Sequence, residues 1–174
     1  VEDIPKEGLL VKGERDEIWL RELFRGQKAL DFTFITPISF QLRLTRSNFL
    51  VLVDGFIKLN LGLTCSRCLE QFTFSIDHKF KSFISPANFH KLPLEMELTK
   101  EDLDMEFYSG DTIDLGQIIQ NQIILSIPFN PLCGEECKGL CPHCGINRNR
   151  ETCKCTEEEI IHPRLLILKD FFKK

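Results

Sequence analysis

The positions of the eight cysteines constrain the fold of this chain more than any other feature of its sequence. Cys65 and Cys68 stand alone, whereas the other six lie within residues 133–155. A disulfide framework that closes long loops would spread its cysteines along the chain. The first residues lack the basic and apolar regions of a signal peptide, so we expect a cytoplasmic protein. Short clustered pairs in that compartment are typical of metal ligands.

The spacing of the cysteines predicts two zinc ions, each held by four thiolates. Two pairs have the Cys-x-x-Cys spacing that presents two ligands from one tight turn. Four intact pairs can combine into two sites in three ways. We favour one site built from Cys65, Cys68, Cys133 and Cys137, and a second, local site built from Cys141, Cys144, Cys153 and Cys155. The chain must turn between the last two cysteines, because an extended strand would hold their sulfurs too far apart.

Other uses of these thiols remain open at this point. His143 lies between two cysteines and is a candidate substitute ligand. Four thiolates also suit an iron–sulfur cluster. Free buried thiols and a redox disulfide are the further alternatives, although no βαβ pattern flanks either Cys-x-x-Cys pair.

Alternating apolar and polar residues predict a sheet over residues 29–85. Residues 40–45, 57–64 and 72–77 each place an apolar side chain at every second position. This period of two buries one face of a strand. Ser47-Asn48 and Asp54-Gly55 have the composition of hairpin turns. We therefore expect an α+β fold built on a bent antiparallel sheet or partial β-barrel, with a packed helix and a C-terminal cysteine-rich metal module.

Helix signals lie on both sides of the expected sheet. Asp16 is a suitable N-cap for a short helix over residues 17–25. Asp114 caps a helix over residues 115–126, with Gln117 as its capping-box partner and Pro128 after its end. The expected buried residues are Ile18, Leu20 or Leu23, and Phe24 in the first helix, and Leu115, Ile118, Ile119 and Ile123, with Leu125 or Ile127, in the second.

We expect two domains. A β-rich domain covers residues 1–132, and the zinc module covers residues 133–174 and ends in a helix that Pro163 opens. No apolar run is long enough for a membrane helix.

Charge is distributed unevenly along a chain whose net charge is −4. Residues 95–114 carry eight acidic residues and one lysine. This run overlaps an irregular segment that we expect over residues 85–110. Bases exceed acids in residues 41–91 and 138–174. The overall acidity argues against indiscriminate nucleic-acid binding, because counterion release favours basic proteins. A local basic surface is compatible with this distribution.

Several segments of the sequence together have the pattern of one protein family: residues 63–69, 114–115, 127–128, 133–147, 153–155 and 162–165. The most specific part is the string CKGLCPHCG, and the similarity covers most of the chain from about residue 30. These segments resemble the YceD-type large ribosomal RNA subunit accumulation proteins. The resemblance implies a bacterial or plastid factor that is required for normal levels of large-subunit (23S) ribosomal RNA, and it implies no established catalytic residues.

The basic residues beside the cysteines predict a non-enzymatic factor that binds ribosomal RNA or a pre-ribosomal particle. Arginine contacts phosphate through two hydrogen bonds or stacks on an exposed base. The candidate RNA-binding residues are Arg148, Arg150, Lys154, Lys138 and Arg67. For any one of them, solvation of a ligand loop is the simpler interpretation.

Two other function classes compete with RNA binding. In a protein-interaction scaffold, zinc would be structural and residues 95–114 would dock a basic partner such as a ribosomal protein or an assembly factor. A flexible solvated loop is the simpler interpretation of that acidic run. An enzyme with a small-molecule substrate is disfavoured, since eight cysteines fill two zinc sites completely and no phosphate loop, nucleophile elbow or His-Glu-x-x-His motif is present.

Overall fold

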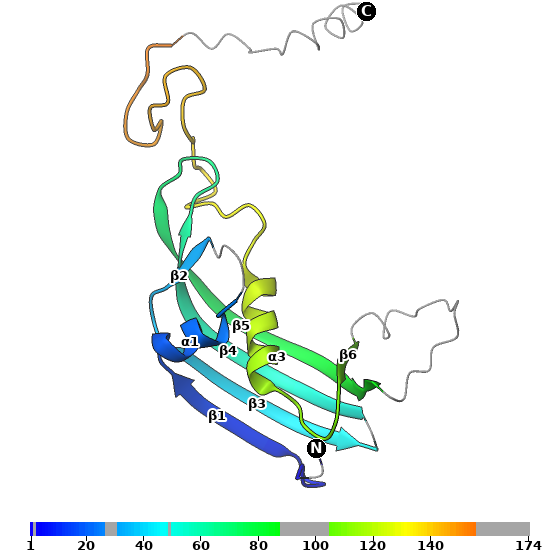
Figure 1. Cartoon of the computed structure of the whole chain (residues 1–174). Coiled ribbons are helices and arrows are strands. Elements are labelled where there is room, and N and C mark those ends of the chain that lie inside the picture. The colour runs from blue at the N-terminus through cyan, green and yellow to red at the C-terminus, as the bar shows by residue number, and fades with distance from the viewer. Residues whose placement is uncertain (2, 27–30, 49, 88–104, 156–174) are drawn as a thin grey trace, which may run out of the picture.

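A computed structural model describes residues 1, 3–26, 31–48, 50–87 and 105–155 and has an α+β fold, as the sequence predicts. Its sheet is bent and open, with the strand order β1-β3-β4-β5-β6 and with β2 paired to β4 (Figure 1). Only the β5–β6 pairing is parallel among these strands. The elements are β1 (Leu9–Arg15), α1 (Glu17–Leu23), β2 (Phe32–Phe34), β3 (Ile38–Ser47), β4 (Leu50–Thr64), β5 (Gln71–Pro86), β6 (Met105–Tyr108) and α3 (Leu115–Ser126).

The sheet is wider than the sequence predicts. Strand β1 pairs with β3 along its whole length, although it lies outside the predicted range of residues 29–85. Strand β6 begins inside the segment predicted to be irregular and pairs with the end of β5. Strands β2 and β3 pair with successive stretches of β4, so Pro37 lies where the chain passes from one strand to the next.

Strand β4 runs straight through Asp54-Gly55, which contradicts the hairpin predicted there. Gly55 pairs with Leu42 on one side and with Phe80 on the other. A Cβ atom at Gly55 would lie 2.1 Å from Cζ of Phe80, so the phenyl ring occupies the space that a side chain would take. Glycine here permits a close cross-strand approach rather than a turn. The other predicted turn is present, because Asn48 between β3 and β4 has a positive φ of 57°.

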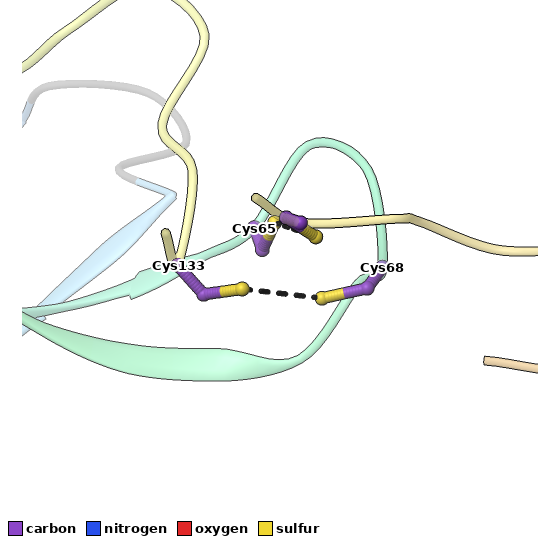
Figure 2. Close-up of side chains that lie close together, drawn as sticks. Cys65, Cys68 and Cys133 are labelled. Atoms are coloured by element: carbon purple, nitrogen blue, oxygen red, sulfur yellow. Dashed lines mark hydrogen bonds between the residues drawn. The ribbon is translucent and has the colours of Figure 1, made fainter. Parts of the chain in front are cut away.

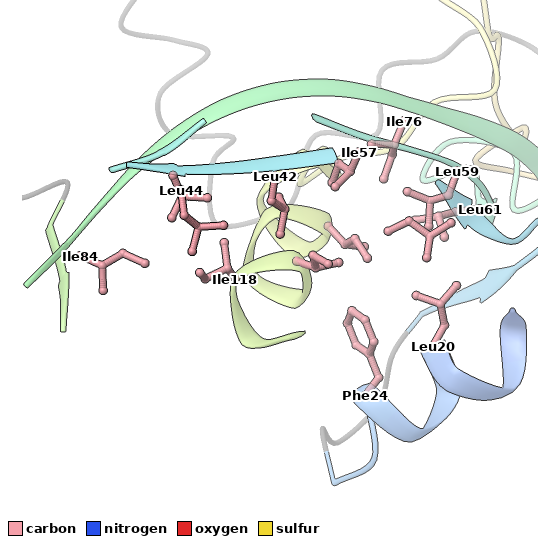
Figure 3. Close-up of a cluster of buried hydrophobic side chains, with 14 of the residues drawn as sticks. Leu20, Phe24, Leu42, Leu44, Ile57, Leu59, Leu61, Ile76, Ile84 and Ile118 are labelled. Atoms are coloured by element: carbon pink, nitrogen blue, oxygen red, sulfur yellow. The ribbon is translucent and has the colours of Figure 1, made fainter. Parts of the chain in front are cut away.

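The hydrophobic core lies between one face of the sheet and the two described helices (Figure 3). This inner face carries the odd-numbered residues of β4 and the even-numbered residues of β3 and β5. From α3 it receives Ile118, Ile119 and Ile123, and from α1 it receives Leu20, with Phe24 directly after that helix. Helices α1 and α3 are also linked directly, since Nε2 of Gln120 donates to the carbonyl oxygen of Leu23 at 3.0 Å.

The two predicted N-caps are confirmed, whereas some details of the helices differ. Asp16 accepts a hydrogen bond from the backbone N–H of Trp19, and Asp114 accepts from Gly116 and Gln117. The Gln117 side chain donates to Asn121 instead of closing a capping box. Helix α1 ends at Leu23 rather than at residue 25. Ile18 and Leu125, both candidates for burial, are 77% and 74% exposed.

The opposite, outer face of the sheet meets no other element in the part of the chain that the structure describes (Figure 1). None of the described helices is long and apolar enough to span a membrane. The division into domains over residues 1–132 and 133–174 stays a prediction.

We predict that Gly55→Ala lowers the free energy of unfolding by about 1–3 kcal/mol, because the new methyl group displaces the Phe80 ring from the core. Urea denaturation measures the change. Gly13→Ala is the matched control, since its Cβ would meet Phe40 at an ordinary 3.4 Å. The double variant Gly55→Ala/Phe80→Leu should lose less stability than the sum of its two single variants. Strict additivity would contradict the proposed contact.

Candidate metal centres

The loop between β4 and β5 is a tight turn over residues 65–70 that contains Cys65 and Cys68. The backbone N–H of Cys65 donates to the carbonyl of Glu70 at 2.8 Å, and the N–H of Leu69 donates to the carbonyl of Cys65 at 2.9 Å. Leu69 has a positive φ of 60°. Because β4 and β5 hold both ends of this loop, the positions of Cys65 and Cys68 are set by the register of the sheet.

Residues 141–146 repeat the same turn outside the sheet. The N–H of Cys141 donates to the carbonyl of Ile146 at 2.8 Å, and the N–H of Gly145 donates to the carbonyl of Cys141 at 2.9 Å. Gly145 has a φ of 74° at the position that Leu69 occupies in the first loop. The two Cys-x-x-Cys loops therefore share one backbone conformation, which places both sulfurs of each pair on the same side of the turn.

The first group joins this β4–β5 loop to the segment after α3. The sulfurs of Cys65, Cys68, Cys133 and Cys137 all lie within 4.8 Å of one another. The Cys65–Cys137 and Cys68–Cys133 sulfur pairs are each 3.7 Å apart, and Figure 2 shows the second pair facing each other. A disulfide would require about 2.05 Å. Four thiolates at about 2.3 Å from a zinc ion define a tetrahedron with edges of about 3.8 Å. The observed separations fit one tetrahedral ion.

The second group is local. The sulfurs of Cys141, Cys144, Cys153 and Cys155 also lie within 4.8 Å of one another. The chain from residue 151 to 155 is neither helix nor strand, which is consistent with the turn that the Cys153-x-Cys155 spacing requires. Both groups thus contain the cysteines that the sequence favours for each site. His143 belongs to neither group.

Backbone hydrogen bonds prepare one thiol of each group for deprotonation. Burial opposes ionisation of Cys65, yet N–H groups of Cys133, Cys68 and Arg67 lower its pKa to about 6. Backbone N–H groups of Cys144 and His143 likewise lower the pKa of Cys141 to about 6, against the effect of burial. A cation that binds at either group therefore meets a thiol that readily becomes a thiolate.

A second thiol in each group retains its proton because of its neighbours. Hydrogen bonding to Cys137 and Cys68 raises the pKa of Cys133 to about 12. Hydrogen bonding to Cys144, together with burial, raises the pKa of Cys155 to about 12. These protons must leave when a metal ion binds, so metal binding releases protons.

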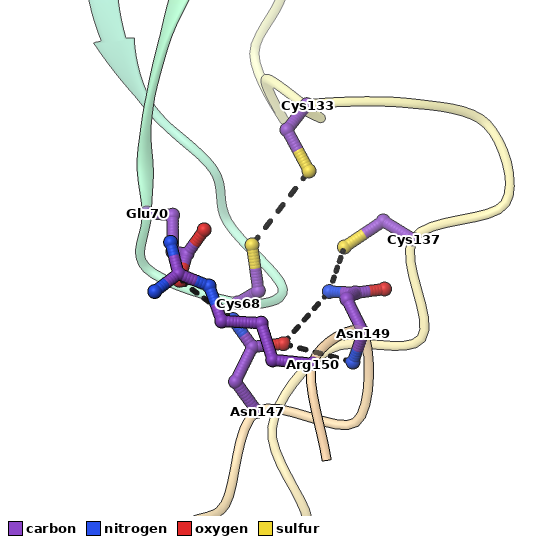
Figure 4. Close-up of polar contacts among 7 residues, drawn as sticks. All are labelled: Cys68, Glu70, Cys133, Cys137, Asn147, Asn149 and Arg150. Atoms are coloured by element: carbon purple, nitrogen blue, oxygen red, sulfur yellow. Dashed lines mark hydrogen bonds and ion pairs between the residues drawn. The ribbon is translucent and has the colours of Figure 1, made fainter.

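Two asparagines support the first group, and sequence reasoning missed them. Nδ2 of Asn149 donates to the sulfur of Cys137 at 3.4 Å (Figure 4). Oδ1 of Asn149 accepts from the backbone N–H of Lys138 at 2.8 Å. Asn147 accepts from both nitrogens of Asn149 and donates to Glu70 at 2.9 Å. Their spacing, Asn-x-Asn directly after a Cys-x-x-Cys turn, was the available signal. Hydrogen bonds of this kind orient metal ligands.

Contacts of Arg67 join the β4–β5 loop to the segment that contains Cys137. Its side chain donates to the carbonyl of Cys137 at 3.1 Å, and its own carbonyl accepts from Leu140 at 3.0 Å. Gly139 lies beside it with a φ of 70°, and a Cβ there would approach the Arg67 carbonyl oxygen to 3.0 Å. Glycine is therefore required at residue 139 by both conformation and space.

All five predicted RNA-binding residues are exposed, and the side chains of Arg67 and Arg150 also make contacts within the fold. Arg67 makes the contacts described above. Nε of Arg150 pairs with Glu70 at 2.8 Å (Figure 4). Glu70 thereby balances part of the positive charge at this end of the molecule. Arg148, Lys154 and Lys138 complete the set. The role of these residues in RNA binding stays a prediction.

The acidic run and the predicted tail helix lie largely outside the described residues. Residues 95–104 and 156–174, which include Pro163, are not among the described residues. In the described remainder of the acidic run, Glu106 accepts a hydrogen bond from Ser82 at 2.8 Å and Asp114 caps α3. The carboxylates of Glu106 and Asp114 therefore accept hydrogen bonds within the fold.

The shared conformation of the two turns gives opposite expectations for two substitutions. Gly145→Leu should destabilise its turn by about 1–2 kcal/mol, the penalty for a side chain at positive φ. No described atom lies within 4 Å of a Cβ at Gly145, so the effect is purely one of backbone conformation. Leu69→Gly removes the same penalty and should leave the first turn equally or more stable. Hydrogen exchange of residues 65–70 and 141–146 measures both effects, and equal destabilisation by the two substitutions would contradict the analysis.

Comparison with known proteins agrees with the resemblance seen in the sequence. The profile described as Large ribosomal RNA subunit accumulation protein YceD matches residues 53–172. The protein named Large ribosomal RNA subunit accumulation protein YCED homolog 1, chloroplastic, is 24% identical in Arabidopsis thaliana, with 74% of this chain and 47% of the relative covered. The Zea mays protein of that name is 26% identical, with 79% and 54% covered.

A bacterial relative extends the comparison. An uncharacterised protein of Mycobacterium tuberculosis is 31% identical, with 55% of this chain and 44% of the relative covered. The chain spans about half the length of the curated relatives it matches. No solved structure gives a significant match. Because the family profile covers more than half of the chain, including all eight cysteines, this protein belongs to the YceD family of large ribosomal RNA subunit accumulation proteins.

Proposed function

We propose that this protein is a non-enzymatic factor that supports large-subunit (23S) ribosomal RNA accumulation and ribosome biogenesis by binding ribosomal RNA or a pre-ribosomal particle. The observation that carries the proposal is the pair of four-cysteine groups. They hold in place an exposed basic segment, residues 147–154, which contains Arg148, Arg150 and Lys154. The names of the two plant relatives, both large ribosomal RNA subunit accumulation proteins, support the same process. Family membership supports it independently of those names.

Zinc is the metal we propose for both groups. Their donors are all thiols, which suits zinc and iron–sulfur clusters alike. An iron–sulfur cluster is larger than one ion and would hold its four cysteine sulfurs farther apart. Sulfur separations of 3.7 Å in the first group instead match a single tetrahedral ion. Bound zinc would supply crosslinks between loops that contain few large apolar side chains.

A structural role for the metal follows from the number of ligands. A catalytic zinc ion keeps one position open for water or substrate. Each group here offers four thiols to one ion. These residues therefore hold the loops in place and leave no coordination site for a reaction.

The basic segment is held by the backbone of the metal module. The N–H of Arg148 donates to the carbonyl of Gly139 at 2.9 Å, and the N–H of Arg150 donates to Asn147 at 3.0 Å. An isolated antiparallel β-bridge pairs Leu140 with Asn147. A preorganised backbone loses little conformational entropy when its side chains bind phosphate. We propose that Arg148, Arg150 and Lys154 contact RNA, with Lys138 and Arg67 at the margin of the same surface.

A protein-interaction scaffold is the second candidate function, and one observation favours it. Several apolar side chains are exposed around a hollow beside the first cysteine group. Phe129 is 98% exposed and Leu69 is 63% exposed. Such apolar clusters mark protein–protein contacts. In this alternative, a ribosomal protein or an assembly factor binds the zinc-stabilised scaffold, and the acidic run contributes to docking.

A cytoplasmic location is part of the proposal for this chain. The names of the two plant relatives place those proteins in the chloroplast.

We predict that the purified protein contains about two zinc ions per chain. Elemental analysis measures the content, and Cys137→Ser together with Cys144→Ser should abolish both sites. Asn149→Ala should weaken metal retention at the first group by roughly 10-fold or more, because Cys137 loses its hydrogen bond. Asn121→Ala on α3 is the control. Iron in place of zinc, with visible absorption, would exclude this assignment.

Chelation should open residues 133–155 before the sheet. The metal module has little core of its own, so metal binding supplies much of its folding free energy. The inner face of the sheet, by contrast, retains its packing on α3. Hydrogen exchange after chelator treatment measures the order of opening. Simultaneous loss of protection in β3, β4 and the metal module would show that the two parts unfold together.

Replacing Arg148, Arg150 and Lys154 together with alanine should weaken binding to large-subunit ribosomal RNA. Sedimentation with precursor particles and filter binding at several salt concentrations measure the effect. Each lost phosphate contact should flatten the plot of log affinity against log salt by roughly 0.7–0.9. The control, Lys6→Ala/Arg21→Ala/Arg25→Ala, removes the same charge from exposed residues remote from the metal module.

Two further outcomes separate RNA binding from protein docking. Replacing the acids of residues 95–104 should leave RNA binding unchanged or improved. If those acids dock a basic protein, their replacement would instead weaken particle association. Unaltered association of the Arg148/Arg150/Lys154 variant, with zinc content intact, would favour the scaffold.

A further inference from the structure

Two adjacent cross-strand rows on the outer face of the sheet collect most of its positive charge. We call them the basic rows. Each row runs across β1, β3, β4 and β5, perpendicular to the strands. The first row is Lys12, Gln41, Phe56 and Lys79, and the second is Leu10, Arg43, Asp54 and Lys81. The four cations come from three different strands, so no single strand reveals the cluster.

The charge excess is confined to these two rows. They contain four cations and one anion, Asp54, whose carboxylate lies 3.5 Å from Nζ of Lys81. The next row contains Glu14, Ser39, Lys58 and Asp77 and therefore has more acids than bases. These rows form a strip of positive charge on a chain whose net charge is −4. The strip therefore attracts anions to one defined part of the surface. Its complement is a polyanion.

Aromatic side chains lie within and beside the basic rows. Half-buried Phe56 lies between Gln41 and Lys79 in the first row. Phe83 follows Lys81 by two residues on the same face of β5 and is 37% exposed. A shallow hollow in this face is lined in part by Arg43, Phe56 and Lys79. Lys79, Lys81 and Phe83 follow one another at about 6.7 Å along the outer face of β5, and Phe56 lies beside Lys79 on β4. This arrangement is suited to a ligand that is itself a chain of charges and flat rings.

We propose that the basic rows are a second RNA-binding surface, which takes unpaired RNA. Phosphates contact Lys12, Arg43, Lys79 and Lys81, and bases stack on Phe56 and Phe83. The proposal rests on the proposed function for its ligand, RNA, and adds a surface on the opposite side of the sheet from the helices. Aromatic side chains on an open sheet stack only on bases that are not paired.

Charge alone would also admit an acidic peptide. The aromatic residues favour RNA, since a peptide carboxylate gains nothing from a phenyl ring. The two ligands therefore differ in whether binding depends on Phe56. They also differ in salt dependence, which is steep for a regularly charged nucleic acid.

The test uses the metal-loaded full chain and a single-stranded oligouridylate of about 12 nucleotides, a length that spans one sheet platform. Fluorescence anisotropy measures the dissociation constant at several salt concentrations. Lys79→Gln/Lys81→Gln should weaken binding at least about fivefold and flatten the salt plot by roughly 1.4, for two lost phosphate contacts. Phe56→Leu should weaken binding by roughly fivefold or more without changing the salt slope.

Lys58→Gln is the matched control, because it removes one cation from the same face of β4 in the row that contains the acids. It should change the dissociation constant by less than about twofold. A wild-type constant for Lys79→Gln/Lys81→Gln would overturn the proposal, as would an equal loss for Lys58→Gln. Tighter binding of polyglutamate than of oligouridylate, indifferent to Phe56→Leu, would also overturn it. Circular dichroism and zinc content verify that each variant is folded.

The Arg148/Arg150/Lys154 variant separates this inference from the proposed function. If only that variant loses binding, the proposed function stands and the basic rows are excluded. If only the sheet variants lose binding, the basic rows stand and the metal module is excluded as the RNA contact. Absence of binding by the wild-type protein would contradict both.

Discussion

The antiparallel register between β4 and β5 determines where Cys65 and Cys68 of the first cysteine group and the residues of the basic rows on these two strands lie. It runs from Val51 paired with Ile84 to Thr64 paired with Gln71. At its closed end, the register places Cys65 and Cys68 on a short turn. Along its length, it sends alternate side chains into the core and onto the outer face. The first proposed metal centre and the basic rows therefore depend on one set of backbone hydrogen bonds.

The metal module is joined to this hairpin mainly by polar and thiol contacts. Among the described residues, Phe72 and Leu132 are the partly buried hydrophobic side chains that pack on the cluster formed by Cys65, Cys68 and Cys137. The polar contacts include hydrogen bonds, such as Ser66 to Pro131 and Leu140 to Arg67, and the ion pair between Arg150 and Glu70. Each hydrogen bond contributes about 1 kcal/mol net, which is little for ordering so many residues. A metal ion bound by the proposed centres would supply the stability that such a module requires.

Sequence patterns predicted the features that local chemistry determines. Helix α3 has the predicted bounds because Asp114 and Pro128 mark its ends. The grouping of the cysteines followed from keeping close pairs together. The hairpin predicted at Asp54-Gly55 was wrong, because a dipeptide carries no information about the partner strands. Glycine is needed at residue 55 because the Phe80 ring on β5 fills the space of a side chain.

Features that depend on long-range pairing were not predictable. Strand β1 escaped notice because only Leu9 and Val11 supply its apolar alternation before Gly13. Asn149 lies twelve residues from the thiol that it contacts. The basic rows draw on three strands separated by long stretches of sequence, so their charge becomes visible only when the register is known.

The alternation along β4 also limits how the length of this protein can vary in evolution. Inserting or deleting one residue between Gly55 and Cys65 would exchange the inner and outer faces over part of the strand. It would bury lysine and asparagine, expose leucines and displace the cysteine turn from its partner segment. An insertion or deletion of two residues keeps each side chain of β4 on its face of the sheet. It only lengthens or shortens the part of the β4–β5 hairpin that leads to the cysteine turn. In this part of the chain, insertions and deletions are therefore tolerated in steps of two, unless a bulge absorbs the extra residue.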